Sequence, residues 1–176
     1  MLTDTHCHLT YHDLASQIPD VLARAADANV TRMITVATTP ADARAAIALA
    51  DAHPQVHVAA GIHPHEAARV STDDLGALAA LHRGQWPGAP AGRLAAVGET
   101  GLDFHYDFAP ADVQERVFRF QLELACEVGR PVIIHARKAE ERVCEILADY
   151  PSLAGRVVFH CFSCGVDVAR RVLDGG

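Results

Sequence analysis

The chain of 176 residues lacks several features that would direct its interpretation elsewhere. No glycine-rich phosphate fingerprint opens its first helical segment, which counts against a dinucleotide-binding fold. Its five cysteines are unevenly spaced, and Cys161 and Cys164 have no second pair that would complete a zinc cage. No apolar run is long enough to cross a bilayer, and no signal-peptide pattern opens the chain. We therefore expect a cytoplasmic protein with reduced thiols and no membrane partner.

An excess of positive charge is also absent. Fifteen Lys and Arg residues against 22 Asp and Glu residues give a formal net charge of −7. The chain is therefore not expected to form a stable complex with nucleic acid through its overall charge. A phosphate ligand would have to be bound by local positive charge, from a metal ion or a few arginines. The hydrophobic fraction of 50% is ample for one packed core, so we expect a single domain over residues 1–176.

What the sequence does contain is an alternation of apolar, β-branched runs with segments of helical periodicity. We predict strands at residues 2–8, 33–37, 56–61, 94–97, 132–134 and 157–159, and helices at 14–28, 40–52, 73–81, 110–128, 140–150 and 166–173. Pro40 is expected at the first helical position, and residues 84–92 as a loop. Continuously apolar strands are typical of a parallel sheet that is buried on both faces. Repeated strand–helix units allow a closed (β/α)8 barrel or an open doubly wound sheet.

The first strand carries Asp4, His6 and His8 on one face, because successive side chains of a strand point to opposite faces. Two histidines on one face form half of a divalent-metal site, with Cys7 turned away. Asp4 is expected to orient the His6 ring by accepting a hydrogen bond from it. The pattern is short, and a chance pair of histidines on a solvated strand is the alternative.

Four further strands end on a residue that can bind a metal ion, namely His63, Glu99, His135 and His160. In a barrel the carboxyl ends of the strands converge on one face, where active sites lie. A structural role would explain any one of these residues. Five strands that all end in this way by chance are improbable, so we predict a metal centre.

Several motifs together resemble the TatD-like metal-dependent deoxyribonucleases. The motifs are Asp4-Thr5-His6-Cys7-His8, Gly61-Ile62-His63-Pro64-His65, Gly98-Glu99-Thr100-Gly101-Leu102-Asp103, Gln121-Leu122, Pro131-Val132-Ile133-Ile134-His135-Ala136-Arg137 and His160-Cys161-Phe162-Ser163. The resemblance implies a TIM (β/α)8-type α/β barrel, two divalent metal ions (Zn, Mn or Mg) and hydrolysis of phosphodiester bonds in DNA, at single strands or ends.

The resemblance also implies a set of metal ligands. His6 and His8 would bind one ion, Glu99 would bridge both ions, and His135 and His160 would bind the second. A bridging carboxylate can hold two divalent ions close together, and imidazole suits zinc, manganese and similar metals.

Other residues are expected around the ligands. His63 would lie near the substrate phosphate and act with Glu99 in catalysis, while His65 and Arg137 would contact the substrate. A salt bridge at the start of the next helix is an equal alternative for Arg137. Glu66 and Asp103 are expected as partners of the ligands or as caps, His105 as an ordinary loop residue, and His12, His53, His57 and His82 as surface residues.

Two departures from the family pattern are visible. Cys164 stands where the family has glycine, and a turn with positive φ there would cost about 1 kcal/mol. Only six of the eight strand–helix units of such a barrel are readable, and the family's carboxylate at the end of strand eight has no counterpart. We therefore expect an incomplete barrel that is open at its first and sixth strands, with the first metal ion bound more weakly than the second.

Three classes of function remain open. The leading one is a metal-dependent hydrolase that cleaves phosphodiester bonds of DNA in the manner of an exonuclease. The second is an amidohydrolase that cleaves a C–N or C–O bond of a small molecule, commonly with a carboxylated lysine between its metals. The chain has one lysine, Lys138, and Glu99 occupies the fourth strand end, which favours the first class. The third is a catalytically impaired fragment that binds metal.

Overall fold

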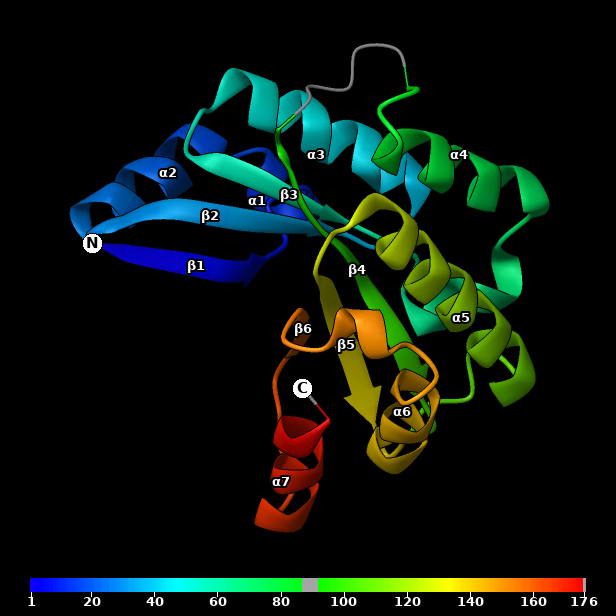
Figure 1. Cartoon of the computed structure of the whole chain (residues 1–176). Helices are drawn as coiled ribbons and strands as arrows, with labels where there is room; N and C mark the ends of the chain where they lie inside the picture. Colours follow the sequence, from blue (N-terminus) through cyan, green and yellow to red (C-terminus); the bar gives the residue numbers. More distant parts are fainter. Residues whose placement is uncertain (87–91, 176) are drawn as a thin grey trace.

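The computed structural model describes residues 1–86 and 92–175, and it contains a six-stranded parallel sheet. The strands are neighbours in chain order: β1 (Leu2–Cys7), β2 (Val30–Ala37), β3 (Val56–Ala60), β4 (Leu94–Asp103), β5 (Val132–Arg137) and β6 (Val157–Phe159). A doubly wound sheet reverses its strand order at a switch point, and this sheet does not. Figure 1 shows the sheet curling from β1 round to β6 as part of a barrel wall, as expected.

Helices alternate with the strands and cover the outer face of the sheet (Figure 1). They are α1 (His12–Ala15), α2 (Ile18–Asp27), α3 (Pro40–Ala52), α4 (Thr72–His82), α5 (Ala111–Val128), α6 (Glu140–Leu147) and α7 (Val166–Asp174), with short 3-10 helices η1 (Pro64–Arg69) and η2 (Pro151–Leu153). Pro40 opens α3 as predicted, and Ser71 caps α4 by accepting a hydrogen bond from the Asp74 N–H. The predicted helix at 14–28 is divided into α1 and α2, and η1 was not predicted.

Apolar side chains form a thick layer outside the sheet and a thin one inside it. The outer clusters combine strand and helix residues, whereas the inner cluster consists of Val36, Ala59, Ala96 and Ile133. The prediction that the strands are buried on both faces holds for the central strands and is wrong for β1 and β6. These strands are the edges of the sheet, and Leu2 and Val158 are 58% and 53% exposed.

Strand β4 is longer than predicted, so Glu99 lies within it and not beyond its end. The predicted strand covered residues 94–97, which are only the apolar part of β4. Gly98 and Gly101 have positive φ, 137° and 141°, and a Cβ on Gly101 would overlap the carbonyl oxygen of His135. Glycine at 101 therefore lets β4 and β5 stay paired beside the pocket.

Two further sequence predictions concern the surface. His82 was expected there, but its side chain is buried, and its Nε2 lies 2.9 Å from the carbonyl oxygen of Ala60. Of the predicted loop at 84–92, residues 87–91 lie outside the described residues. In the part of the chain that the structure describes, none of the helices combines the length and apolarity needed to cross a membrane.

Candidate metal centre

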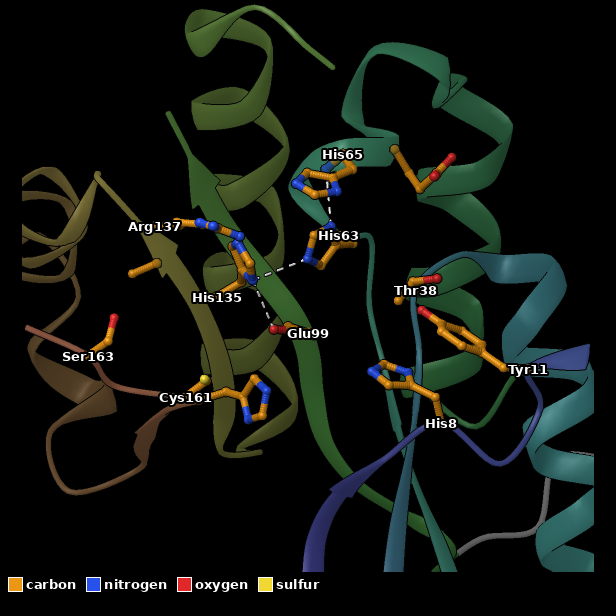
Figure 2. A pocket seen from close by; sticks show the side chains of 13 residues that line it. His8, Tyr11, Thr38, His63, His65, Glu99, His135, Arg137, Cys161 and Ser163 are labelled. Atoms are coloured by element: carbon orange, nitrogen blue, oxygen red, sulfur yellow. Dashed lines mark hydrogen bonds and ion pairs between the residues drawn. The ribbon is translucent and has the colours of Figure 1, made fainter. Parts of the chain in front are cut away.

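A pocket of about 590 Å³ opens at the carboxyl ends of the strands. Among its lining residues are those that the sequence singled out, except His6: His8, His63, His65, Glu99, His135, Arg137 and His160. Figure 2 shows His8 and Tyr11 on one side of the pocket and His135 and Arg137 on the other, with Glu99 between them. The strand ends therefore converge as expected for a barrel.

Glu99 is buried at the base of the pocket and contacts both sides of it. Its Oε1 lies 3.1 Å from Nδ1 of His135, and its Oε2 lies 3.3 Å from Nε2 of His6. Burial alone would raise the pKa of the Glu99 carboxyl, but the contacts with His135 and His6 outweigh burial and hold that pKa well below its usual range. The carboxylate is therefore ionised and able to bind a cation.

On the β1 side, the rings of His6 and His8 lie 5.2 Å apart, and Cys7 packs away from them into the outer core. Neither ring nitrogen of His6 has a hydrogen-bond partner among the described residues. His8 Nδ1 lies 3.0 Å from the Val36 carbonyl oxygen. A carbonyl can only accept, so Nδ1 carries a proton and Nε2 is the nitrogen available to a metal ion.

On the β3–β5 side, His63, His65 and His135 gather around Asp103. The Asp103 Oδ2 accepts hydrogen bonds from Nε2 of His65 at 2.8 Å and from Nε2 of His135 at 2.9 Å. His135 Nδ1 is thereby left facing Glu99 Oε1 and His63 Nε2, which is 3.2 Å away (Figure 2). Burial and the neighbouring His135 lower the pKa of His63 to about 3, so His63 is neutral.

These donor sets fit divalent metal ions. His6, His8 and Glu99 offer ligand atoms within 4.8 Å of one another, and so do His63, His65 and His135. Buried ring nitrogens without a partner are costly unless something binds them, and His6 has two. Imidazole with a bridging carboxylate suits zinc, manganese or similar ions.

The geometry groups the histidines differently from the expected ligand sets. His135 lies with His63 and His65, whereas the ring of His160 stacks on that of His6 with centroids 3.4 Å apart. The division of the ligands between two ions therefore stays a prediction. The expected role of Asp4 is wrong, because its Oδ1 accepts from the backbone N–H of His6, at 3.0 Å, and not from the ring.

Two supporting residues carry more of the site than the sequence suggested. Asp103, expected as a ligand partner or a cap, binds two histidines and the loop that follows it, and it does not cap α5, whose N-cap is Pro110. Its Oδ1 accepts from the N–H groups of His105 and Tyr106, at 2.9 and 3.0 Å, while its Oδ2 binds the two histidines. Burial would raise the pKa of Asp103, but these hydrogen bonds hold it well below its usual range.

Gln121 of α5 is the second, and it was not predicted as a site residue. Its Oε1 accepts from the Ile62 N–H at 2.8 Å, and its Nε2 donates to Thr100 Oγ1 at 2.6 Å. Gln121 thereby links Ile62, which precedes His63, to Thr100, which follows Glu99. The available signal was that Gln121, like Gln114, falls on the apolar face of the predicted helix, and both side chains are buried.

Three smaller questions from the sequence are settled by position. The guanidinium of Arg137 lies over the Tyr106 ring, 4.8 Å from its centroid, and forms no ion pair within the described residues. Lys138 is exposed and does not line the pocket. The positive φ near His160 falls on Cys161, at 48°, so the expected strain at Cys164 is absent.

Comparisons with known proteins agree with this geometry. The family model described as TatD related DNase matches residues 3–176. The chain is 34% identical to the uncharacterized metal-dependent hydrolase YabD of Bacillus subtilis (strain 168), over 98% of this chain and 65% of that protein. It is 36% identical to the 3'-5' ssDNA/RNA exonuclease TatD of Edwardsiella piscicida, over 92% of this chain and 60% of that protein.

Solved structures show the same fold. The crystal structure of YJJV, a TatD homologue from Escherichia coli K12, superposes with a TM-score of 0.90 at 31% identity, covering 99% of this chain and 65% of that one. A hydrolase of the TatD family from Entamoeba histolytica superposes with a TM-score of 0.87 at 21% identity, covering 99% of this chain and 62% of that one. The chain thus spans less than two thirds of the length of these proteins.

Proposed function

We propose, on the basis that the chain belongs to the family of TatD-related DNases, that it hydrolyses phosphodiester bonds of DNA at single strands or ends. The observation that carries the proposal is the convergence of two histidine groups on one buried carboxylate, Glu99. The proposal also includes a cytoplasmic location, the absence of a stable nucleic-acid complex and a single domain over residues 1–176.

The proposed cofactors are two divalent metal ions, from among zinc, manganese and magnesium. His6, His8 and Glu99 would hold one ion, and His135 and His160 would hold the second together with Glu99. Ions bound there supply charge that polarises a phosphoryl oxygen and lowers the pKa of a water molecule. The ionised Glu99 is already in the protonation state that a ligand requires, and the hydrogen bond from His8 Nδ1 to Val36 leaves Nε2 as the nitrogen that can face an ion.

The protein's own groups orient the substrate. His63 is neutral and lies 3.2 Å from His135, so its ring is positioned to contact a phosphate beside the ligands. His65 is held by Asp103 and faces the same pocket. Arg137 is the only arginine or lysine among the residues that line the described pocket, and a guanidinium can bind a phosphate through two parallel hydrogen bonds. Its position supports a role in holding the strand.

The amidohydrolase alternative has no comparable support, because the chain's single lysine, Lys138, is exposed outside the pocket and cannot bridge metals there. The test is to load the protein with each metal in turn and incubate it with labelled single-stranded DNA and, separately, with a dihydroorotate-type cyclic amide. Cleavage of DNA that EDTA abolishes supports the proposal. Turnover of the amide alone would replace it, and bound metal without either reaction would mark a binding protein.

A further inference from the structure

The loop that follows β4 exposes three aromatic rings beside the pocket. Phe104, Tyr106 and Phe108 are 37%, 42% and 57% exposed. The ring centroids of Tyr106 and Phe108 lie 5.4 Å apart, with their planes 38° from parallel. Clustered apolar rings in contact with water mark a binding surface, because covering them is favourable.

The loop is fixed relative to the candidate metal centre. Asp103 binds the N–H groups of His105 and Tyr106 through Oδ1 and the rings of His65 and His135 through Oδ2. The loop is also held at its far end, because Gln114 Nε2 donates to the Ala109 carbonyl at 2.8 Å. The aromatic rings are therefore placed before any ligand arrives, which lowers the entropy cost of binding.

The rings are continuous with the pocket. The ring centroids of His63 and His65 are 4.4 Å apart, and His65 is 4.6 Å from Phe108 and 5.5 Å from Tyr106. A ligand that fills the pocket at His63 therefore has its next group within reach of the two exposed rings.

Arg137 joins the two regions. Its Nη1 lies 3.4 Å from the Tyr106 hydroxyl, and its Cζ lies 4.8 Å from the centre of that ring, while the side chain also lines the pocket. A guanidinium stacked on an aromatic ring can bind a phosphate along its edge. The ring itself can then accept the flat face of a base.

The loop suits the base and not the phosphate. It contains Asp107 and lacks lysine and arginine over residues 104–109, so it repels an anion but accepts an uncharged planar group. A base that is paired within a duplex is already stacked on its neighbours, whereas an unpaired base is free to stack on protein rings.

We propose that Tyr106, Phe108 and Arg137 form a stacking site for one unpaired base of the substrate strand, next to the phosphate at the metal centre. The site deepens the proposed function by assigning the selectivity for single strands to this loop.

The test is a binding measurement that does not depend on cleavage. Short phosphorothioate oligothymidylates that resist hydrolysis are titrated into the metal-loaded protein and followed by fluorescence anisotropy. The variants are Tyr106→Leu and Phe108→Leu, which keep apolar volume but remove the ring, with Tyr106→Phe as the conservative control. Matched strands with abasic residues and a blunt duplex complete the series.

We expect each Leu variant to bind the single strand about ten-fold more weakly, and Tyr106→Phe, which keeps the ring but loses the hydroxyl beside Arg137, to lose much less affinity than Tyr106→Leu. The abasic strand and the duplex should bind the unchanged protein and the Leu variants equally. Equal binding of the base-carrying strand by all variants would overturn the stacking site while leaving the proposed hydrolysis intact. Retained base discrimination in a protein that cleaves no DNA would instead leave the stacking site and overturn the proposed function.

Discussion

The β1 side of the pocket and its β3–β5 side use the same side-chain types but hold them differently. On the β3–β5 side, Asp103 fixes His65 and His135 by hydrogen bonds of 2.8 and 2.9 Å, and each strand has a neighbour on both edges. On the β1 side, His6 lies on an edge strand, and neither of its ring nitrogens has a partner within the described residues. The rings of His65 and His135 are therefore oriented by hydrogen bonds within the protein, whereas the His6 ring depends on stacking, on its contact with Glu99 and on any bound ion.

The two sides therefore differ in how much their histidines contribute to folding and how much to metal binding. A hydrogen-bonded histidine contributes to folding whether or not a metal is bound, but its ring is less free to reorient toward a metal ion. A buried histidine without partners costs free energy in the absence of metal and recovers that cost on binding. Glu99 contacts both sides, at 3.3 Å from His6 and 3.1 Å from His135, so it is the residue through which the sides are coupled.

The largest effect is expected for Glu99→Ala. Loss of the shared carboxylate should lower the bound metal and reduce nuclease activity together, the latter by about 1000-fold or more, because several kcal/mol of charge stabilisation would be lost. Metal content by plasma mass spectrometry and turnover on single-stranded DNA measure both. Glu123→Ala, which removes an exposed carboxylate from α5, is the control. Full metal content with full turnover in Glu99→Ala would show that the two sides are not coupled through this residue.

The comparison predicts that two histidines contribute unequally to the free energy of unfolding in the absence of metal. His135→Ala should lower the free energy of unfolding by about 3 kcal/mol, because it removes one charge-assisted hydrogen bond from each of the buried carboxylates of Glu99 and Asp103. His6→Ala should change it by no more than about 1 kcal/mol, because its ring nitrogens form no hydrogen bond within the described residues and only Nε2 contacts a carboxylate, at 3.3 Å from Glu99 Oε2. Urea unfolding in EDTA provides both values. Equal losses would contradict the division into two sides.

His63→Ala tests whether this histidine is a ligand or contacts the substrate. With the ligand sets of the proposed function, turnover should fall about 100-fold while most of the metal is retained. Calorimetric titration of each metal into His63→Ala and His135→Ala makes the comparison directly. If both variants lose metal equally, His63 is a ligand of the β3–β5 side, as its grouping with His65 and His135 allows.

Gly101→Ala should damage the β3–β5 side through the backbone alone. Its φ of 141° and the overlap of an added Cβ with the His135 carbonyl predict a loss of about 2 to 3 kcal/mol in the free energy of unfolding. Gly76→Ala is the matched control, because a Cβ there meets nothing within 4 Å in helix α4. That change should stabilise the protein by about 0.5 kcal/mol. Both values come from urea unfolding, and similar values for the two variants would remove the argument for close approach at β4 and β5.

Much of this fold and the approximate place of the site could be predicted from the sequence. The apolar runs and helical periods are local signals, and the carboxyl ends of parallel strands meet by geometry. Glu99, His135 and His160 could therefore be placed around one pocket before any coordinates were known. The edge strands were predicted too buried, because periodicity does not say which strands have neighbours.

The pairing of the histidines could not be predicted, because it depends on register and rotamers. The β1–β2 ladder is irregular between Asp4 and Cys7, and the β4–β5 ladder between Val97 and Thr100, so strict alternation does not place the ligands. The Asp103 carboxylate binds histidines that are 32 and 38 residues away, and the Gln121 amide binds Ile62, which is 59 residues away. A carboxylate or an amide whose partners are so distant in sequence leaves no local pattern.

His82 is a buried support of the β3–β5 side that the sequence placed at the surface. Its Nε2 donates to the Ala60 carbonyl at 2.9 Å, at the end of β3, and its Nδ1 has no partner among the described residues. Protonation of Nδ1 would bury an N–H group without an acceptor. Burial accordingly lowers the pKa of His82 to about 4, although the hydrogen bond to Ala60 opposes the shift.

The smallest expected effect is the contribution of His82 to the pH dependence of stability. Because its pKa in the fold lies below the ordinary value of 6.5, the unfolded chain binds more protons between pH 6.5 and pH 4. The stabilising contribution is therefore complete above pH 6.5 and is lost as the pH falls toward 4.

His82→Gln keeps an N–H donor for Ala60 but does not titrate. Between about pH 7 and pH 5, its free energy of unfolding should therefore fall by about 1 to 2 kcal/mol less than that of the unchanged protein. Urea unfolding in EDTA at both pH values measures the difference, and His12→Gln, at a fully exposed position, should leave the pH dependence as it is. Equal pH dependence in His82→Gln and the unchanged protein would mean that the fold does not lower the pKa of His82.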